Sequence, residues 1–589
     1  MNQRMPTRIP NEEIVKLLKE ALAAMEIKGD NRFAIRAYQN AIASIDNLTS
    51  SVFDMWENNR LREISGVGGA LEQHLGELFE TGKVAEWVAK KKDLPDGMFE
   101  LLILRGVGPK TAFKLSKQFK INDREDALKI IKKAAKAGKI QELPGFGEKS
   151  EKDILDSIED LKHSKSEKQR MLLSHAEEIA GRVVTYLREH DKVVDAQALG
   201  SLRRRASTVG DIDIAVSSDS PKEVIDYFVK FPEIKDIESQ GDRMSTVILS
   251  VGAQVDILVS AVDSYGSMLQ HFTGSKQHNI KLRQHALEQG MSLSQYGVKE
   301  GKKGEKKLNK FSNEKDFYKH LGLEWVPPEL REGQDEINLA QSGKLPKLIE
   351  VSDIKGDLHV HTTDSDGTNT LEEMVTAARE LGYEYLGNAD HAPSVQSRGK
   401  YEVLGIIDKK RMQIERLNEK YDDIKILYGY EVNILKDKTL GMPDELLEKL
   451  DYVIAGIHTA FDSDRELATE RLLSAIRNPL VDIIAHPTGR LINERNSLDI
   501  DWNKVFAEVI KHNKILEINS HPTRLDLPDH LVRDALKEGI KIVINTDAHS
   551  TSDLHLMKYG IDVARRGGCT AKDVLNTDSK MYNLLSRNL

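Results

Sequence analysis

The sequence predicts a multidomain α/β protein with a helical N-terminal quarter, an α+β centre and a C-terminal parallel sheet or barrel. Three observations support this prediction. The chain has 589 residues, more than one hydrophobic core usually organises. Apolar residues recur at helical spacing within residues 1–160, for example in segment 12–27. Beyond residue 350, short apolar runs alternate with helical stretches, which indicates repeated βα units.

The composition is that of a globular protein, with 30% charged and 39% hydrophobic residues. The net charge of −9 argues against a uniformly basic surface for nucleic acid but allows local patches. Residues 101–140 carry 11 Lys/Arg against 3 Asp/Glu, which fits either a solvated helical face or a DNA-contact patch. The single cysteine, Cys569, excludes an intramolecular disulfide and a cysteine-based zinc site. We see no signal peptide and no membrane-spanning run, and therefore expect a cytoplasmic protein without a membrane partner.

A short glycine pattern recurs in the helical quarter, at residues 64–68, 104–108 and 143–147. Its two glycines allow a tight turn with positive φ, and the helix that follows offers free N–H groups to phosphate. A single copy is well explained as a helix connector. Three copies, two of them beside the basic stretch, favour sequence-independent binding of the DNA backbone. The candidate DNA-binding residues of these turns are Gly66, Gly68, Gly106, Gly108, Lys110, Gly145 and Gly147.

Two aspartates on one predicted strand mark the central region. Asp211 and Asp213 project from the same face because side chains alternate along a strand, and a second strand offers Asp256. Three carboxylates that lie so near one another repel unless cations neutralise them. We therefore expect two Mg²⁺ or Mn²⁺ ions there. An Asp-x-Asp pair alone is commonly a surface turn, but the upstream Gly-Ser pair favours nucleotidyl transfer. We predict that Asp211, Asp213 and Asp256 are catalytic metal ligands and that Gly200, Ser201 and Arg204 hold a dNTP triphosphate.

Ligand-type residues close each of seven apolar runs in the C-terminal region, and in βα barrels the chemistry lies at the ends of the strands. The runs are 357–361, 383–391, 424–432, 452–458, 481–487, 515–521 and 541–549. One strand-end histidine is usually structural, but nine candidates suit about three metal ions. Mixed His and carboxylate ligation favours Zn²⁺ or Mn²⁺ and phosphoester hydrolysis. The candidate ligands are His359, His361, Asp366, His391, Glu431, His458, His486, Asp547 and His549.

Up to about residue 335 the chain resembles DNA polymerase family X. The resemblance rests on the aspartate trio and on the segments 272–279, 296–297 and 325–331, together with Arg283. It implies that Phe272 and Gly274 line the nucleotide sugar pocket, that Asn279 touches the new base pair and that Arg283 contacts the template. It also implies a DNA-end-binding helical domain with a helix-hairpin-helix motif (1–90), fingers with two such motifs (91–165), a nucleotidyltransferase α+β palm (166–262) and a thumb (263–340).

Two departures from the family pattern bear on activity. The family usually has tyrosine before Phe272, whereas this chain has His271, which puts rejection of ribonucleotides in doubt. Family members with deoxyribose-phosphate lyase activity have lysines after the first hairpin. The matching positions here are Ala70 and His74, which cannot form a Schiff base, so no lyase of that kind is expected.

After a linker at 341–350, residues 351–589 resemble the polymerase-and-histidinol-phosphatase (PHP) domain, a distorted (βα)₇ barrel. The filled metal positions imply an active hydrolase, and Glu517, Asn519 and Arg524 resemble the substrate-side stretch of that family. In polymerases of this type the domain is associated with Mn²⁺-dependent 3′–5′ exonuclease and end-processing or abasic-site cleavage.

The whole chain therefore predicts a repair polymerase that fills short gaps in primer-template or gapped DNA with a 5′-phosphate, works as a monomer and trims ends. One alternative is an end-processing nuclease or phosphatase whose polymerase half mainly binds DNA. Another is a non-catalytic DNA-binding scaffold. The first is favoured because both acid clusters are complete in the sequence.

Overall fold

The computed structural model divides into two compact units, Met1–Lys168 and Gln169–Leu589. The division falls three residues beyond the end expected for the fingers at residue 165, and no division falls at the expected linker 341–350. The described residues are 9, 11–45, 52–57, 60–64, 66–104, 107–143, 146–147, 150–152, 154–155, 157–158, 170–301 and 307–585.

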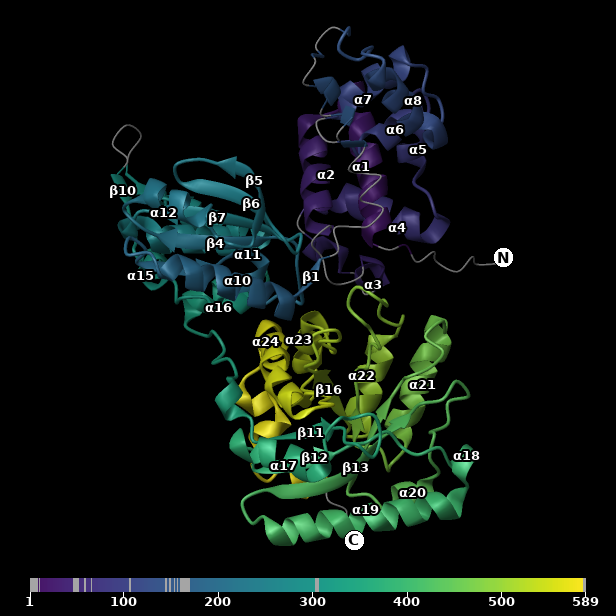
Figure 1. Cartoon of the computed structure of the whole chain (residues 1–589). Helices are drawn as coiled ribbons and strands as arrows, with labels where there is room; N and C mark the ends of the chain where they lie inside the picture. The colour runs from purple at the N-terminus through teal and green to yellow at the C-terminus, as the bar shows by residue number, and fades with distance from the viewer. Residues whose placement is uncertain are drawn as a thin grey trace. The chain divides into compact units, whose positions relative to one another are not determined.

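The N-terminal unit is helical, as the apolar periodicity predicts, and Figure 1 shows its helices in purple and blue. Two hydrophobic cores organise it, one centred on residues such as Leu18 and Phe79 and one on Leu115 and Ile131. Buried Glu20 pairs with a lysine and an arginine from later helices. The helices are α1 (Asn11–Lys28), α2 (Arg32–Ile45), α3 (Val52–Glu57), α4 (Gly69–Thr81), α5 (Ala85–Lys91), α6 (Gly97–Leu101), α7 (Pro109–Gln118) and α8 (Arg124–Lys136).

A mixed five-stranded sheet forms the predicted palm, with strand order β2-β4-β7-β6-β5. The central pair, β4 and β7, is parallel, and the other pairs are antiparallel. Buried apolar residues of α10 and α12 share one core with the sheet. The elements are β1 (Met171–Leu172), α10 (Leu173–Arg188), β2 (Asp195–Ala198), α11 (Gly200–Arg203), β3 (Thr208–Val209), β4 (Ile212–Ser217), α12 (Pro221–Phe228), β5 (Ile234–Gln240), β6 (Met244–Leu249) and β7 (Gln254–Ser260).

The predicted thumb has its own core, which includes Leu282, Phe317 and Val326. Its small antiparallel sheet has the order β10-β9-β8. The elements are α13 (Tyr265–Thr273), α14 (Lys276–Glu288), β8 (Ser292–Ser294), β9 (Gly297–Glu300), β10 (Lys307–Asn309), α15 (Glu314–His320) and α16 (Glu336–Ser342).

Seven parallel strands follow one another in chain order around the C-terminal barrel, which confirms the seven runs predicted from sequence. The last strand closes on the first, where the His361 N–H donates to the Ala548 carbonyl at 2.8 Å. Helices surround the strands in Figure 1. The strands are β11 (Gly356–Val360), β12 (Tyr385–Asn388), β13 (Lys425–Asn433), β14 (Tyr452–Gly456), β15 (Ile483–Ile484), β16 (Ile515–Asn519) and β17 (Ile542–Asn545). The helices are α17 (Leu371–Glu380), α18 (Val395–Arg398), α19 (Lys400–Lys420), α20 (Asp444–Leu447), α21 (Arg465–Arg477), α22 (Trp502–Lys511), α23 (Asp529–Lys537), α24 (Met557–Gly567) and α25 (Tyr582–Leu585).

The barrel interior is filled by side chains. Tyr452 is fully buried and its hydroxyl donates to the Leu358 carbonyl at 2.6 Å. A Cβ on Gly387 would lie 2.3 Å from that hydroxyl, and one on Gly429 would lie 2.6 Å from the same ring. Only glycine fits beneath the tyrosine at these two positions. The packed interior leaves the strand ends as the place where functional groups gather.

The palm, thumb and barrel are tied together by ion pairs from three consecutive arginines. Each arginine reaches a carboxylate on a different element. The pairs are Arg203–Glu314 (2.7 Å), Arg204–Glu332 (3.1 Å) and Arg205–Asp562 (2.6 Å).

Helix α24 of the barrel also reaches back toward the thumb. Its Arg565 pairs with Glu329 and its Arg566 with Glu332, both at 2.8 Å. Residues 341–350 therefore join parts that pack against each other rather than parts held apart. Among the described residues, none of the helices has the length and apolar character needed to cross a lipid bilayer.

Candidate active sites

Three aspartates converge on one face of the palm sheet. Asp213 on β4 and Asp256 on β7 are direct cross-strand partners, and Asp211 immediately precedes β4. Ile212 and Ile214 are fully buried, so strand alternation turns the aspartates to the opposite face. The structure thus brings together the trio that the sequence singled out.

The electrostatics of this trio favour a cation. Burial, followed by the charges of Asp211 and Asp256, raises the pKa of Asp213 to about 6. An ionised trio is therefore unfavourable unless positive charge arrives. Oxygen ligands of this kind suit Mg²⁺ or Mn²⁺, so the donor set fits the expected ions.

The Gly-Ser turn lies directly against the trio. Gly200, with φ of +57°, begins the short helix α11, and a Cβ there would lie 2.8 Å from the Oδ2 atom of Asp213. Glycine is thus required by close approach as well as by backbone conformation. The Arg204 guanidinium lies behind this turn, where it donates to the Thr273 carbonyl at 2.5 Å and to Glu332 at 3.1 Å.

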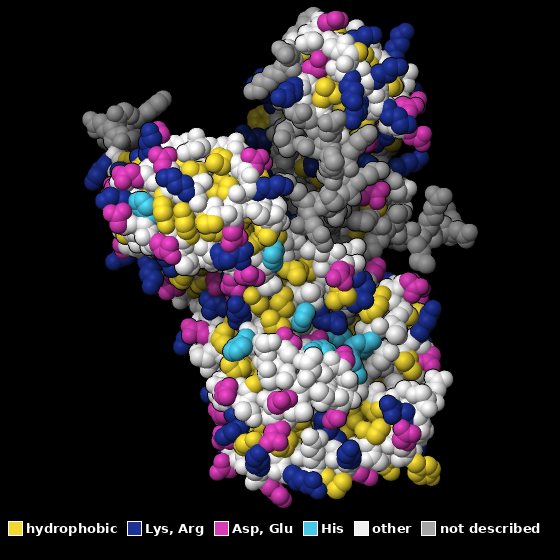
Figure 2. Space-filling view, viewed as in Figure 1, with side chains coloured by type: hydrophobic (Ala, Val, Ile, Leu, Met, Phe, Trp, Pro, Cys, Tyr) yellow, Lys and Arg dark blue, Asp and Glu magenta, His cyan; other side chains and the backbone are white. Residues whose placement is uncertain are grey.

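All nine candidate ligands of the barrel gather at the C-terminal ends of its strands. Three groups have ligand atoms within 4.8 Å of one another, and each could hold a metal ion. His486, outside the groups, has its Nε2 atom 2.7 Å from the Oε1 atom of Glu431. Figure 2 shows histidine side chains reaching one face of this part of the molecule. The groups are His361, Asp366, His391 and His549; His359, His361 and Asp547; and His391, Glu431 and His458.

The histidines have the unfilled bonding capacity that a metal cluster needs. Ring nitrogens of His359, His361, His458 and His486 are buried without a hydrogen-bond partner among the described residues. Buried polar atoms of this kind are costly unless a ligand satisfies them. The set of imidazoles and carboxylates therefore fits Zn²⁺ or Mn²⁺.

Opposite charges offset each other inside the cluster. Burial alone would lower the pKa of His359, but Glu517, Asp547 and Glu431 raise it well above its usual range. Burial alone would raise the pKa of Glu431, but His458 and His359 hold it well below its usual range. The carboxylates are therefore ready to act as ligands in their ionised form.

Backbone conformation at the strand ends is also specialised. His486 and Asp547 have φ of +29° and +56°, values that residues other than glycine rarely adopt. Strain of this kind persists where the surrounding structure enforces it, commonly at functional sites. Nearby, a Cβ on Gly456 would lie 2.7 Å from the His486 ring and 3.0 Å from the His458 ring.

Known proteins resemble the chain over both regions. Family models match residues 9–84 (helix-hairpin-helix domain), 99–160 (SAM-like helix-hairpin-helix tandem), 268–332 (DNA polymerase beta thumb) and 357–521 (PHP domain). The chain is 36% identical over 570 residues to the DNA polymerase/3′-5′ exonuclease PolX of Bacillus subtilis, covering 96% of this chain and 97% of that protein. The chain belongs to the family X DNA polymerases that carry a C-terminal PHP domain.

The PHP domain also resembles free-standing proteins. A probable phosphatase of Thermoanaerobacter sp. is 31% identical over 233 residues, which covers 38% of this chain and 90% of that protein. A probable phosphatase of Acetivibrio thermocellus is 31% identical over 202 residues, covering 33% and 78% of the two chains. The PHP barrel of this polymerase is thus similar to hydrolases that occur without a polymerase.

The residues predicted to form the nucleotide pocket lie at and near the junction of α13 and α14. The Asn279 amide is fixed there, since it donates to the His271 carbonyl at 2.7 Å and accepts from Gln270 at 2.7 Å. Phe272 packs edge-on against His271, while Gly274 lies beside Arg204. Arg283 is exposed on α14. The roles proposed for these residues in binding remain predictions.

Two of the three predicted hairpins lead into helices in the way the sequence suggests. Gly66 has φ of +91°, and a Cβ there would lie 2.5 Å from the Ala41 nitrogen. Gly68 and Gly108 immediately precede α4 and α7, and Lys110 is exposed at the start of α7. Gly147 is also described, whereas Gly106 and Gly145 lie outside the described residues.

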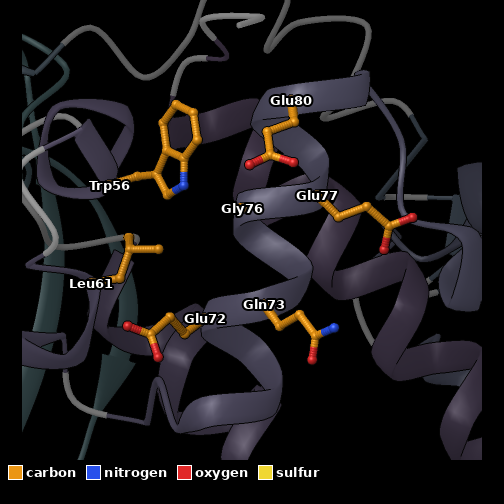
Figure 3. Close-up of a pocket in the computed structure, with 7 residues that line it drawn as sticks. All are labelled: Trp56, Leu61, Glu72, Gln73, Gly76, Glu77 and Glu80. Carbon is orange, nitrogen blue, oxygen red and sulfur yellow. The ribbon is translucent and has the colours of Figure 1, made fainter.

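Ala70 and His74, the positions where lyase-active family members have lysines, carry no amine. His74 lies 2.9 Å from the Tyr38 hydroxyl and 3.0 Å from a Glu86 oxygen. A neighbouring pocket of about 440 Å³ is lined by Glu72, Glu77 and Glu80 beside Trp56. Figure 3 shows Glu80 directed toward Trp56 and Glu77 directed away. Among the described residues that line this pocket, three are glutamates and none is a lysine or arginine, a lining that repels phosphate.

The structure corrects one assignment in the PHP domain. Glu517 and Asn519 are fully buried beneath the candidate ligands instead of facing substrate. Glu517 lies 2.7 Å from the Nδ1 atom of His359, and Asn519 donates to Asp547 at 2.9 Å. Carboxylates and amides in this position orient metal ligands. Arg524 remains on the open side, 3.4 Å from Asp547.

Sequence reasoning missed several supporting residues. Asp357 is fully buried and accepts from the Thr546 N–H and hydroxyl, which joins β11 to the segment after β17. Asp390 and Lys410 form a buried ion pair behind the cluster. Asp357 and Asp390 could have been suspected because they lie two residues and one residue before a candidate ligand. Lys410 could also have been suspected, because it lies on the apolar stripe of α19 at helical spacing between Ile407 and Ile414.

Proposed function

We propose that this chain is a gap-filling DNA polymerase whose PHP domain acts as a metal-dependent 3′–5′ exonuclease. The observation that carries the polymerase half is the pairing of Asp213 with Asp256 across β4 and β7, with Gly200 pressed against Asp213. The nine-residue cluster of the barrel supports the nuclease half. The substrates are dNTPs and gapped or primer-template DNA, and the chain acts as a monomer.

In the palm, Asp211, Asp213 and Asp256 would hold two Mg²⁺ or Mn²⁺ ions. Such ions, when bound, supply Lewis-acid activation of a 3′-hydroxyl and charge stabilisation of departing pyrophosphate. Gly200 lets the triphosphate approach the backbone, and Ser201 donates a hydrogen bond to it. The proximity of the trio to this turn aligns the primer end with the α-phosphate.

In the PHP domain, the nine candidate ligands would hold about three Zn²⁺ or Mn²⁺ ions. Bound ions of this kind supply water activated for attack on a phosphoester. Arg524, on the open side of the cluster, would bind the phosphate being cleaved. The buried partners beneath the cluster keep its imidazoles aligned and limit the entry of bulk water.

The test is a gapped duplex with a labelled primer and a 5′-phosphate, incubated with dNTPs or without them, in Mg²⁺ or Mn²⁺. We expect extension with dNTPs in either ion, and stepwise 3′ shortening without dNTPs that Mn²⁺ stimulates. Absence of dNTP-dependent extension in both ions would reject the polymerase proposal. Absence of shortening in both ions would reject the nuclease proposal.

A second candidate for the PHP site is removal of a terminal 3′-phosphate. The similarity to probable phosphatases over most of their length favours it. A primer ending in 3′-phosphate, supplied with dNTPs, distinguishes the two activities. A phosphatase releases inorganic phosphate and leaves a 3′-hydroxyl that polymerisation then extends, whereas an exonuclease releases the terminal nucleotide together with its 3′-phosphate before extension.

A further inference from the structure

A buried ion pair that contains no candidate ligand lies behind the metal cluster. Asp390, 2% exposed, follows β12, and Lys410, 5% exposed, lies in the middle of α19. The Lys410 Nζ atom lies 3.2 Å from the Oδ2 atom of Asp390. A buried charge is costly without a partner, and each residue of this pair offsets the charge of the other.

The Asp390 carboxylate is fully occupied by donors next to candidate ligands. Its Oδ1 atom accepts from the Thr362 N–H at 2.6 Å and from the Ser365 hydroxyl at 2.7 Å. Its Oδ2 atom accepts from the Thr362 hydroxyl and from the Asn388 amide, both at 2.8 Å. With no remaining lone pair directed at the cluster, Asp390 is a support for ligands and not itself a ligand.

These contacts connect three segments that carry candidate ligands. Thr362 follows His361, and Ser365 precedes Asp366. Asp390 itself precedes His391, and its backbone carbonyl accepts from the Glu431 N–H at 3.0 Å. The buried carboxylate of Asp390 therefore fixes the loop that carries His361 and Asp366, directly beside His391, while its backbone carbonyl joins this segment to Glu431.

Lys410 completes the support on the loop side. Its ammonium also donates to Asp364 at 2.5 Å and to the Thr362 hydroxyl at 3.3 Å. Asp364 and Asp366 lie on the same loop, and Asp366 is 52% exposed, the most exposed side chain of the nine candidates. A metal ligand on an exposed loop must be fixed by contacts from outside the loop. Lys410 on helix α19 supplies such a contact through Asp364.

We propose that Asp390 and Lys410 are positioning residues that hold His361, Asp366 and His391 in metal-binding geometry. This inference rests on the proposed metal-dependent function of the PHP domain. Outer-sphere partners of metal ligands typically contribute 10- to 100-fold to metal affinity. Loss of the pair should therefore weaken ion binding in this domain and leave the palm unchanged.

The experiment compares full-length wild type with Lys410→Met, Asp390→Asn and the double variant that carries both changes. Lys409→Met, its exposed neighbour on α19, is the matched control. His361→Ala reports whether the cluster binds metal at all. The measurements are Mn²⁺ content after dialysis, Mn²⁺ affinity by titration, thermal stability, primer extension, and exonuclease rate over a range of Mn²⁺ concentrations.

We expect Lys410→Met and Asp390→Asn to bind Mn²⁺ about 10- to 100-fold more weakly. Excess Mn²⁺ should restore much of their exonuclease rate, while Lys409→Met and primer extension remain at the wild-type level. The double variant removes both charges together and should fold even if a single variant does not. It should still bind Mn²⁺ weakly, because the support of the ligands is lost.

Two outcomes separate this proposal from the function on which it rests. If His361→Ala loses Mn²⁺ while the folded double variant and Lys410→Met retain wild-type affinity, the positioning role is wrong and the metal site stands. If His361→Ala and wild type bind the same amount of Mn²⁺, the PHP metal site itself is wrong.

Discussion

The palm and the PHP barrel each bring three carboxylates together, but only the barrel surrounds them with histidines. In the palm, burial and the two neighbouring aspartates raise the pKa of Asp213. In the barrel, the imidazoles of His359 and His361 hold the pKa of Asp547 well below its usual range, against the effect of burial. The palm thus lacks charge balance on its own, whereas the barrel has much of it built in.

This difference in charge balance predicts how each site acquires its metal ions. The barrel offers many preoriented donors and should retain its ions without substrate, as closed sites with imidazole ligands do. The palm offers a few oxygen ligands and should gain its ions together with the triphosphate, since Mg²⁺ sites commonly share ligands with substrate phosphates. The following predictions test this contrast in order of decreasing effect.

The largest effect is expected from Asp256→Ala in the palm. With only two carboxylates left, we expect single-nucleotide incorporation to fall by at least about 10³-fold, because few ligands remain to replace the lost one. Exonuclease activity on the same primer should stay at the wild-type level. If extension persists within tenfold of wild type, the assignment of the palm trio is wrong.

A somewhat smaller loss is expected from His361→Ala in the barrel. We predict a fall in 3′ shortening of about 10²- to 10³-fold, because eight candidate ligands remain to hold part of the cluster. Primer extension serves as the internal control and should not change. Normal shortening by this variant would contradict the barrel assignment.

A single added methyl group should reduce activity when it lies beside the candidate ligands of the barrel and have no effect elsewhere in the PHP domain. In Gly456→Ala, the new Cβ would collide with the rings of His486 and His458. We expect exonuclease activity to fall about 10- to 100-fold with little change in extension. Gly405→Ala on α19, where a Cβ meets nothing within 4 Å, is the matched control and should behave as wild type.

The smallest effect concerns stability and pH. The folded-state pKa of Asp213, about 6, lies above its ordinary value of 3.8, so ionisation opposes folding of the metal-free protein. This cost is absent below about pH 4, grows as pH rises to about 6 and persists above. Asp213→Asn should therefore stabilise the protein in EDTA by of the order of 1–3 kcal/mol at pH 8 and by less at pH 5.

Thermal melts at pH 5 and pH 8 measure this difference. Asp242→Asn, an exposed change of the same charge between β5 and β6, is the control and should show no such pH dependence. An equal gain for Asp213→Asn at both pH values would mean that the trio is not electrostatically strained.

Much of both sites could be predicted from sequence because strand geometry is periodic. Alternation along β4 places Asp211 and Asp213 on one face, and every barrel strand except β16 ends at or near a candidate ligand, so the chain itself orders the donors. The fold class followed from the same periodicity and is confirmed, including the seven strands of the barrel.

The supporting residues could not be predicted because their roles depend on packing between distant elements. Lys410 interrupts the apolar stripe of α19, but nothing in the sequence identifies Asp390 as its partner. Glu517 lies under His359 although 158 residues separate them, so its burial and partner are invisible locally. The assignment of Glu517 to the substrate side was wrong for this reason.

The three consecutive arginines Arg203, Arg204 and Arg205 limit which parts of this protein can be produced as separate fragments. Each guanidinium has a carboxylate partner on another segment, and Arg205 pairs both with Glu177 on α10 and with Asp562, 357 residues later on α24. A recombinant fragment that ends before the barrel would remove one of the two carboxylates that pair with Arg205 and would uncover the apolar core that the palm shares with the barrel. To obtain only one of the two activities, the other active site should therefore be inactivated by a point substitution in the full-length chain.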